Sequence, residues 1–132
     1  MSLSDEERRV IVELELERTD RIMQQLPTLI TQQYWDTAAN RMYYAAFHAV
    51  SALLIYNAIQ VRTHKGSIVV FNKEFVRTGV FSEEEGKLYA QLEGLRERGD
   101  YNCFIDASEQ EVVPLLKPLH AFIDKIKGLI VK

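Results

Sequence analysis

The chain has 132 residues, of which 16 are Lys or Arg and 19 are Asp or Glu, so its formal net charge is −3. That length fits one domain, residues 1–132, and a composition of 47% hydrophobic and 27% charged residues excludes a disordered chain. The acidic balance also excludes a protein that coats nucleic acid by bulk charge, so any contact with RNA or DNA has to be local.

Three capping boxes mark predicted helix starts, because each pairs a serine with a glutamate three positions later. The serine oxygen can accept from a free amide of the first turn, and the glutamate can accept from the serine amide. The three serines are Ser4, Ser82 and Ser108. Strand signals are poor, since polar and apolar residues alternate only briefly and no Asn-Gly or Asp-Gly turn occurs.

The hydrophobic periodicity predicts a series of helices joined by short connections. Their expected ranges are residues 5–30, 34–58, 64–77, 83–98 and 109–130. Pro27 should bend the first helix or end it early, and Pro114 and Pro118 should make the last one irregular. Gly79 suits the left-handed position after the third helix, and Gly99 should stop the fourth. Short connections favour antiparallel neighbours, so the expected fold class is all-α, a four- to five-helix up-and-down antiparallel bundle.

The segment 34–58 is apolar on nearly every face, which is typical of a buried central helix or of a membrane span. A span needs about 20 apolar residues, a length that this segment barely reaches, and Arg41 and His48 interrupt it. We therefore predict a buried central helix and no association with a membrane.

Arg41, Tyr44 and His48 form one polar line on this helix. Seven positions separate Arg41 from His48, which gives nearly the same azimuth and a rise of roughly 10 Å. A buried arginine without a partner is costly, so two interpretations stand. In the structural one, Arg41 pairs with a carboxylate and His48 bonds to a carbonyl. In the functional one, the histidine moves a proton while the arginine holds a phosphate at a cleft or interface. The carboxylates considered for the structural pair are Asp100 first, then Glu93 and Glu97.

The remaining reactive residues give weaker signals. His64 and Lys65 belong to a locally basic segment that is a candidate for contacts with RNA or nucleotide phosphate, although such runs are usually solvated. The single cysteine, Cys103, excludes an intrachain disulfide framework and a multi-cysteine zinc site, and it fits a reducing cytosol. The histidines have no metal-ligand spacing and the first residues resemble no signal peptide. We expect no metal, no cofactor and a cytoplasmic location.

Several motifs together resemble one known family. The run Asn-Arg-Met-Tyr-Tyr-Ala-Ala-Phe-His-Ala, residues 40–49, is similar to the signature helix of HEPN domains. Three later segments, 63–66, 75–79 and 95–101, resemble motifs that follow that helix in one branch of the family. The resemblance runs in order from about residue 17 to residue 101 and so covers most of the chain.

The resemblance implies a helical bundle that forms a homodimer through its signature helices. Many HEPN proteins are metal-independent endoribonucleases whose motif is an arginine followed, after four to six residues, by a histidine, a pattern that Arg41 and His48 fit. By the family mechanism, His48 acts as base or acid at a ribose 2′-hydroxyl, and Arg41 stabilises charge on the scissile phosphate. Asn40 and Tyr44, on the same helix, are further candidate contacts for nucleotide or RNA.

Two functions therefore follow from the resemblance. The first is a ribonuclease that forms one half of a toxin–antitoxin or related two-gene system. The second is a non-catalytic module that binds a nucleotide or a nucleotidyltransferase partner, and Met42 favours it because catalytic members usually carry a polar residue directly after the arginine. A scaffold in which Arg41 merely pairs with Asp100 is a third reading.

Overall fold

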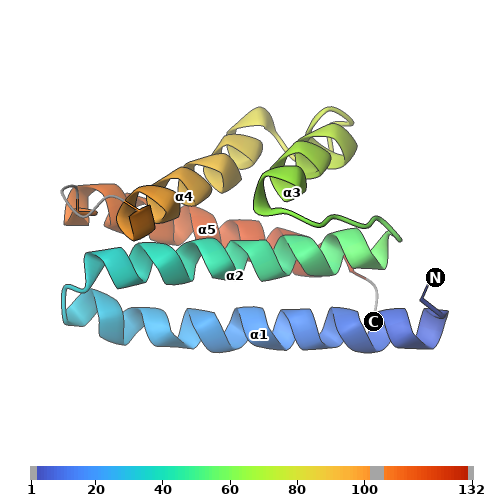
Figure 1. The fold of residues 1–132 in the computed structure, drawn as a ribbon, viewed down its shortest axis with the longest axis horizontal. Coiled ribbons are helices and arrows are strands. Elements are labelled where there is room, and N and C mark those ends of the chain that lie inside the picture. Colours follow the sequence, from blue (N-terminus) through green and yellow to red (C-terminus); the bar gives the residue numbers. More distant parts are fainter. Residues whose placement is uncertain (1–2, 102–105, 131–132) are drawn as a thin grey trace.

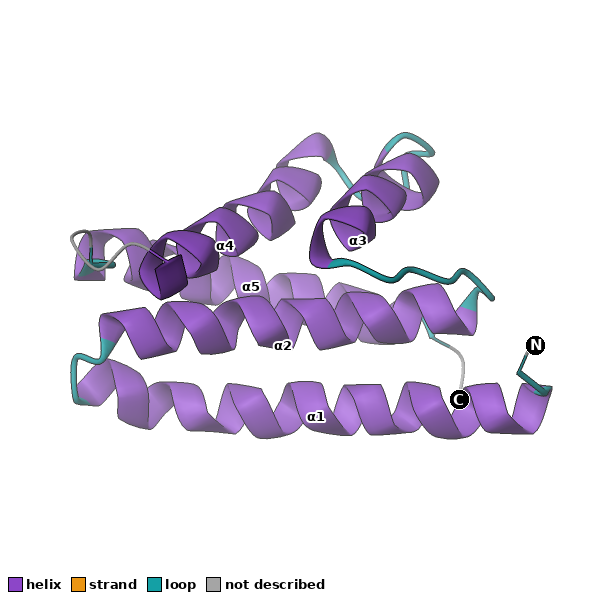
Figure 2. Ribbon diagram, in the orientation of Figure 1, coloured by secondary structure: helices purple, strands orange, loops and turns teal. Residues whose placement is uncertain are grey.

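The computed structural model describes residues 3–101 and 106–130, and side chains at 3–99 and 106–130. Within these ranges there are five α-helices, one π-helical turn and no strand, which confirms the all-α prediction (Figure 2). The elements are α1 (Asp5–Thr31), α2 (Trp35–Tyr56), α3 (His64–Phe71), η1 (Asn72–Val76), α4 (Glu83–Tyr101) and α5 (Glu109–Leu129). Cys103 lies outside the described residues.

The helix starts agree with the sequence. All three capping boxes, at Ser4, Ser82 and Ser108, are formed in both directions, with a serine hydroxyl accepting from the glutamate amide and the glutamate carboxylate accepting from the serine amide. Thr63 caps α3 in a similar way, because its hydroxyl accepts from the Gly66 amide at 2.8 Å. Local side-chain bonds thus fix where four of the helices begin.

The helix ends agree less well. Gly79 adopts the expected left-handed conformation, with φ of 86°, after the π-helical turn that completes the third predicted helix. The predicted stop at Gly99 is wrong, since α4 continues to Tyr101 and Gly99 has no positive φ. Pro27 does not end α1 early, because that helix runs on to Thr31. Glycine marks the end of a helix where its own backbone adopts the left-handed conformation, and the backbone of Gly99 does not adopt it.

Helix α2 is the centre of the bundle (Figure 1). It packs against α1 on one side and against α4 and α5 on the others, and α3 lies across it near its C-terminal end. Six alanines of α2 are almost completely buried and let these neighbours approach closely. They are Ala38, Ala39, Ala45, Ala46, Ala49 and Ala52.

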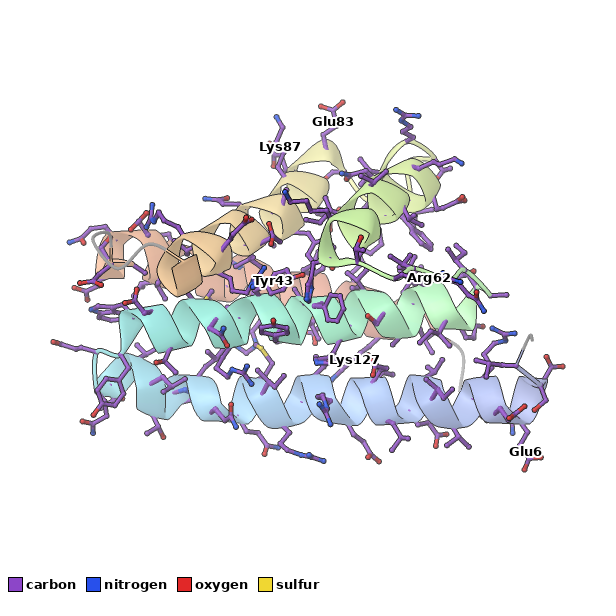
Figure 3. All side chains as sticks on the ribbon, in the orientation of Figure 1. Glu6, Tyr43, Arg62, Glu83, Lys87 and Lys127 are labelled. Atoms are coloured by element: carbon purple, nitrogen blue, oxygen red, sulfur yellow. The ribbon has the colours of Figure 1, made fainter. Side chains whose placement is uncertain are left out.

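The N-terminal helix is held in register by polar contacts as well as by its apolar stripe. The fully buried hydroxyl of Thr19 donates to the carbonyl oxygens of Glu15 and Ala45, at 3.0 and 3.3 Å. Lys127 of α5 donates to Asp20 of α1 at 2.5 Å (Figure 3). The bond from Thr19 to Ala45 fixes which residues of α1 lie beside which residues of α2, and the bond from Lys127 to Asp20 ties α5 to α1.

No helix among the described residues is both long enough and apolar enough to span a bilayer. The apolar character of α2 instead serves the core, as the sequence predicts. One stripe of this helix is left half-exposed, and it carries the polar line. The stripe consists of Asn40, Arg41, Tyr44, Phe47, His48, Ser51 and Ile55.

Candidate functional site

Arg41 is half-buried on the exposed stripe of α2, so the premise that it is enclosed in the core is wrong. Its Nε and Nη2 atoms donate to the side-chain oxygen of Asn40, at 3.1 and 2.8 Å. Its guanidinium also lies over the Tyr44 ring, 5.4 Å from the centroid. The guanidinium is therefore held against the helix surface by neighbours on the same helix, and one side of it faces outward.

The carboxylates considered for Arg41 do not pair with it where they are described. Glu93 forms a buried ion pair with Arg96 at 2.7 Å, and Glu97 makes no ion pair with Arg41. The side chain of Asp100 lies outside the described residues. Arg96 lies 5.0 and 5.8 Å from the ring centroids of Tyr43 and Tyr44, so the Glu93–Arg96 pair supports the aromatic residues of α2 from α4.

His48 has a carboxylate partner that the sequence did not indicate. Its Nδ1 lies 3.0 Å from Oε2 of Glu15 on α1, and the two side chains are 16% and 24% exposed. The expected bond to a carbonyl is therefore replaced by a bond to a carboxylate. With Nδ1 engaged, Nε2 is the ring nitrogen left for a substrate, and the ring has a fixed orientation.

A surface hollow of about 410 Å³ lies between α1 and α2, and the polar line of α2 forms one of its walls. The lining residues are Arg18, Arg21, Ile22, Gln25, Arg41, Tyr44 and His48. Among the residues that the structure describes, no carboxylate pairs with any of the three arginines. Three arginines that line one hollow, none of them paired with a described carboxylate, make a site suited to phosphate or another anion.

The sequence did not indicate Arg18 and Arg21 as site residues, because they belong to the charged face of α1 and such a face is normally exposed to solvent. Their role depends on the register between α1 and α2, which the buried Thr19 helps to set. Only a prediction of that register could have placed the side chains of Arg18 and Arg21 near Arg41.

The other predicted contacts divide into two groups. Asn40, Arg41, Tyr44 and His48 lie on one stripe, whereas Lys65 is exposed on α3 and does not line the hollow. His64 is half-buried, and its Nδ1 is 2.7 Å from the hydroxyl of Tyr43. The structure thus brings His64, but not Lys65, next to the aromatic residues of α2.

The ring of Tyr44 lies close to the rings of both His48 and His64. Its ring centroid is 6.4 Å from that of His48 and 5.7 Å from that of His64. Burial lowers the pKa of His64, so its imidazole is uncharged at neutral pH. Within the described ranges no three His, Cys, Asp or Glu residues gather as a metal site would require.

The chain is similar over most of its length to known proteins. Residues 12–129 match the sequence model of the HEPN domain. A UPF0332 protein of Thermotoga maritima is 33% identical over 94% of this chain and 94% of its own length. Two proteins of Methanocaldococcus jannaschii, both named as candidate toxins, are 29% and 30% identical. They cover 88% and 75% of this chain, and 79% and 73% of their own lengths.

Proposed function

The chain belongs to the HEPN domain family, and on that premise we propose that it is a metal-independent endoribonuclease acting in the cytoplasm as the toxin of a two-gene toxin–antitoxin system. The observation that carries the proposal is the hollow in which Arg41 and a carboxylate-oriented His48 share one exposed surface. The names of the two archaeal relatives support the toxin part.

The chemistry needs a base, an acid and an anion site, and these residues can supply them. Nε2 of His48 takes the proton from a ribose 2′-hydroxyl, and the 2′-oxygen attacks the adjacent phosphorus. The bond from phosphorus to the 5′-oxygen of the next nucleotide breaks, and that oxygen receives a proton from the His48 imidazolium, which returns to its neutral form. Arg41 offsets the negative charge that grows on the phosphate oxygens. Proton gain and loss balance, and the products are a cyclic 2′,3′-phosphate and a 5′-hydroxyl.

A homodimer through α2 explains the spacing of the two residues. If two copies of the stripe pack antiparallel about a twofold axis near positions 44 and 45, Arg41 of one protomer lies beside the partner's His48. Each composite site then contains both groups at close range, although one chain separates them by two helical turns. Tyr44, half-exposed on the same stripe, supplies aromatic surface for such an interface.

A second function has one observation in its favour. Met42 is fully buried, so the position after Arg41 contributes to core packing and adds no polar group to the hollow. The same site then binds a nucleotide, or docks against a nucleotidyltransferase, without cleaving RNA.

Cleavage assays in the presence of EDTA test the proposal. Wild-type protein is expected to cut single-stranded RNA, and Arg41→Ala and His48→Ala are expected to lose that activity. His120→Ala, which changes an exposed histidine of α5, is the matched control and should keep it. Equal cleavage by all four proteins would remove the catalytic assignment. Binding of ATP or RNA by a wild-type protein that cuts nothing would favour the second function.

A further inference from the structure

A second hollow lies beside the proposed cleavage site, between the C-terminal half of α2 and the linker that leads to α3. Its volume is about 140 Å³. The lining residues are Phe47, Ser51, Leu54, Ile55, Ile59, Val61, Arg62, Thr63, His64 and Ser67. Figure 3 labels Arg62 on this linker and Tyr43 on α2. The proposed reaction uses none of the lining residues, so the hollow requires its own explanation.

The walls are about half apolar and half polar, and they include two ring systems. The centroids of Phe47 and His64 are 4.6 Å apart, and their planes are inclined by 50°. Aliphatic side chains of α2 and of the linker form the rest of the apolar half. The rest of the polar half consists of Ser51, Arg62, Thr63 and Ser67. Aromatic and histidine rings beside polar groups that can bond a base edge are the surroundings in which RNA-binding proteins hold unstacked bases.

His64 presents one defined polar edge. The fully buried hydroxyl of Tyr43 lies 2.7 Å from Nδ1 of His64 and occupies that nitrogen. Burial also raises the pKa of Tyr43, so its hydroxyl stays protonated. Nε2 of His64 is left for a ligand, on an imidazole that is uncharged at neutral pH. An uncharged polar edge beside an aromatic ring suits a heterocycle. The exposed guanidinium of Arg62, also in the lining, can donate to a base carbonyl as well as to a phosphate.

The size and the position of the hollow further restrict which ligand can bind there. A volume of about 140 Å³ is well below the ~300 Å³ at which pockets begin to hold drug-sized molecules, so it suits one flat ring and not a whole nucleotide. The Phe47 ring is 5.4 Å from the His48 ring and 4.6 Å from the His64 ring. A base in this hollow therefore lies next to the residues that would act on the adjoining phosphate.

We propose that this hollow binds one unpaired nucleobase of a single-stranded RNA while the adjoining phosphate lies against Arg41, and that it gives the protein its preference among RNA sequences. The inference rests on the proposed function for the identity of the polymer. Its specific claim is that binding depends on a base, and not only on the sugar-phosphate backbone.

Binding of oligonucleotides with 2′-O-methyl riboses tests the claim, because they lack the attacking hydroxyl and stay intact with the wild-type protein. One oligomer carries bases and the other has the same backbone without bases. We expect the wild-type protein to bind the first about tenfold more tightly, the effect of one stacked base. Phe47→Leu and Val61→Phe should each remove most of that ratio and leave the affinity for the abasic oligomer unchanged. Val61→Phe fills the hollow from the linker, so it leaves the α2 stripe intact.

Tyr56→Leu, which changes an aromatic residue of α2 outside this hollow, should keep the full ratio. Light scattering on each variant keeps a change of oligomeric state separate from a change in the hollow. The inference is overturned if the wild-type protein binds both oligomers equally or binds neither, or if both hollow variants keep the ratio. A base-dependent ratio without RNA cleavage would support the inference and count against catalysis. RNA cleavage without a base-dependent ratio would support catalysis and overturn the inference.

Discussion

Glu15 and His48 form a pair across the contact between α1 and α2, with 3.0 Å between Oε2 of the carboxylate and Nδ1 of the imidazole. The pair leaves Nε2 as the only ring nitrogen that can meet a substrate. Glu15 is thus a positioning residue in the proposed reaction, because it acts through His48 and touches no reacting atom. The site is therefore formed by α1 and α2 together.

The first prediction concerns Glu15→Gln. The amide keeps the size of the side chain but no longer fixes the imidazole as a carboxylate does, and misplacement of a catalytic group by about 1 Å can cost on the order of 100-fold in rate. We expect kcat for RNA cleavage to fall about 10- to 100-fold while KM stays near its wild-type value. The free energy of unfolding should change by about 1 kcal/mol or less, as for a partly exposed ion pair.

Glu17→Gln is the matched control, since Glu17 is an exposed residue of the same helix and forms no ion pair with any described residue. Steady-state kinetics and thermal unfolding give both readouts. An unchanged kcat for Glu15→Gln, or a KM effect alone, would show that the carboxylate has no positioning role.

The second prediction concerns the two α1 arginines of the hollow. If Arg18 and Arg21 contact RNA phosphates, the double variant Arg18→Ala/Arg21→Ala should bind a 2′-O-methyl oligonucleotide more weakly at low salt. The slope of log affinity against log salt should decrease by about 0.7 for each lost contact. Arg9→Ala/Arg77→Ala removes two exposed arginines elsewhere and should leave the slope unchanged. Equal slopes for the two double variants would place the RNA outside the hollow.

Much of this fold follows from short-range chemistry that is legible in the sequence. The capping serines at 4, 82 and 108 depend only on residues three positions away, and the polar line of Arg41, Tyr44 and His48 depends only on helical periodicity. The sequence therefore predicts the helices and half of the candidate site.

The other half depends on contacts between helices. Glu15 and Arg18 reach the site because the Thr19 hydroxyl is buried against the carbonyl of Ala45, and no pattern within α1 reveals that register. Arg41 is half-exposed for a related reason, since the arrangement of α1, α4 and α5 around α2 decides which stripe is left uncovered. Gly99 failed as a stop signal because its backbone stays helical.

The third prediction concerns pH and His64. Burial lowers the pKa of this imidazole in the folded protein below the unfolded value of about 6.5, so the unfolded chain binds a proton first as the pH falls. The folded protein should therefore lose stability as the pH falls from about 7 through the lowered pKa, with no further loss below it. His64→Gln should flatten this part of the stability curve, and His120→Ala should not. Urea unfolding at a series of pH values measures the slope, and an equal slope in wild type and His64→Gln would contradict the assignment.

The fourth prediction compares two glycines of α4. A glycine in a helix interior normally costs about 1 kcal/mol relative to alanine, so Gly→Ala should stabilise where space allows. Around Gly94, no described atom outside the adjoining helix backbone lies within 4 Å of an added Cβ, and Gly94→Ala is expected to raise the free energy of unfolding by about 0.5–1 kcal/mol. At Gly86 an added Cβ would lie 2.7 Å from Oδ1 of Asn72 and 2.9 Å from a methyl of Val76, both on η1. Overpacking costs about 1–3 kcal/mol, so Gly86→Ala should cancel the helical gain or destabilise the protein.

Chemical unfolding of the two variants measures the difference in stability. The intrinsic preference of alanine for a helix is the same at both sites. Equal stabilisation by both substitutions would therefore mean that η1 does not pack closely on α4.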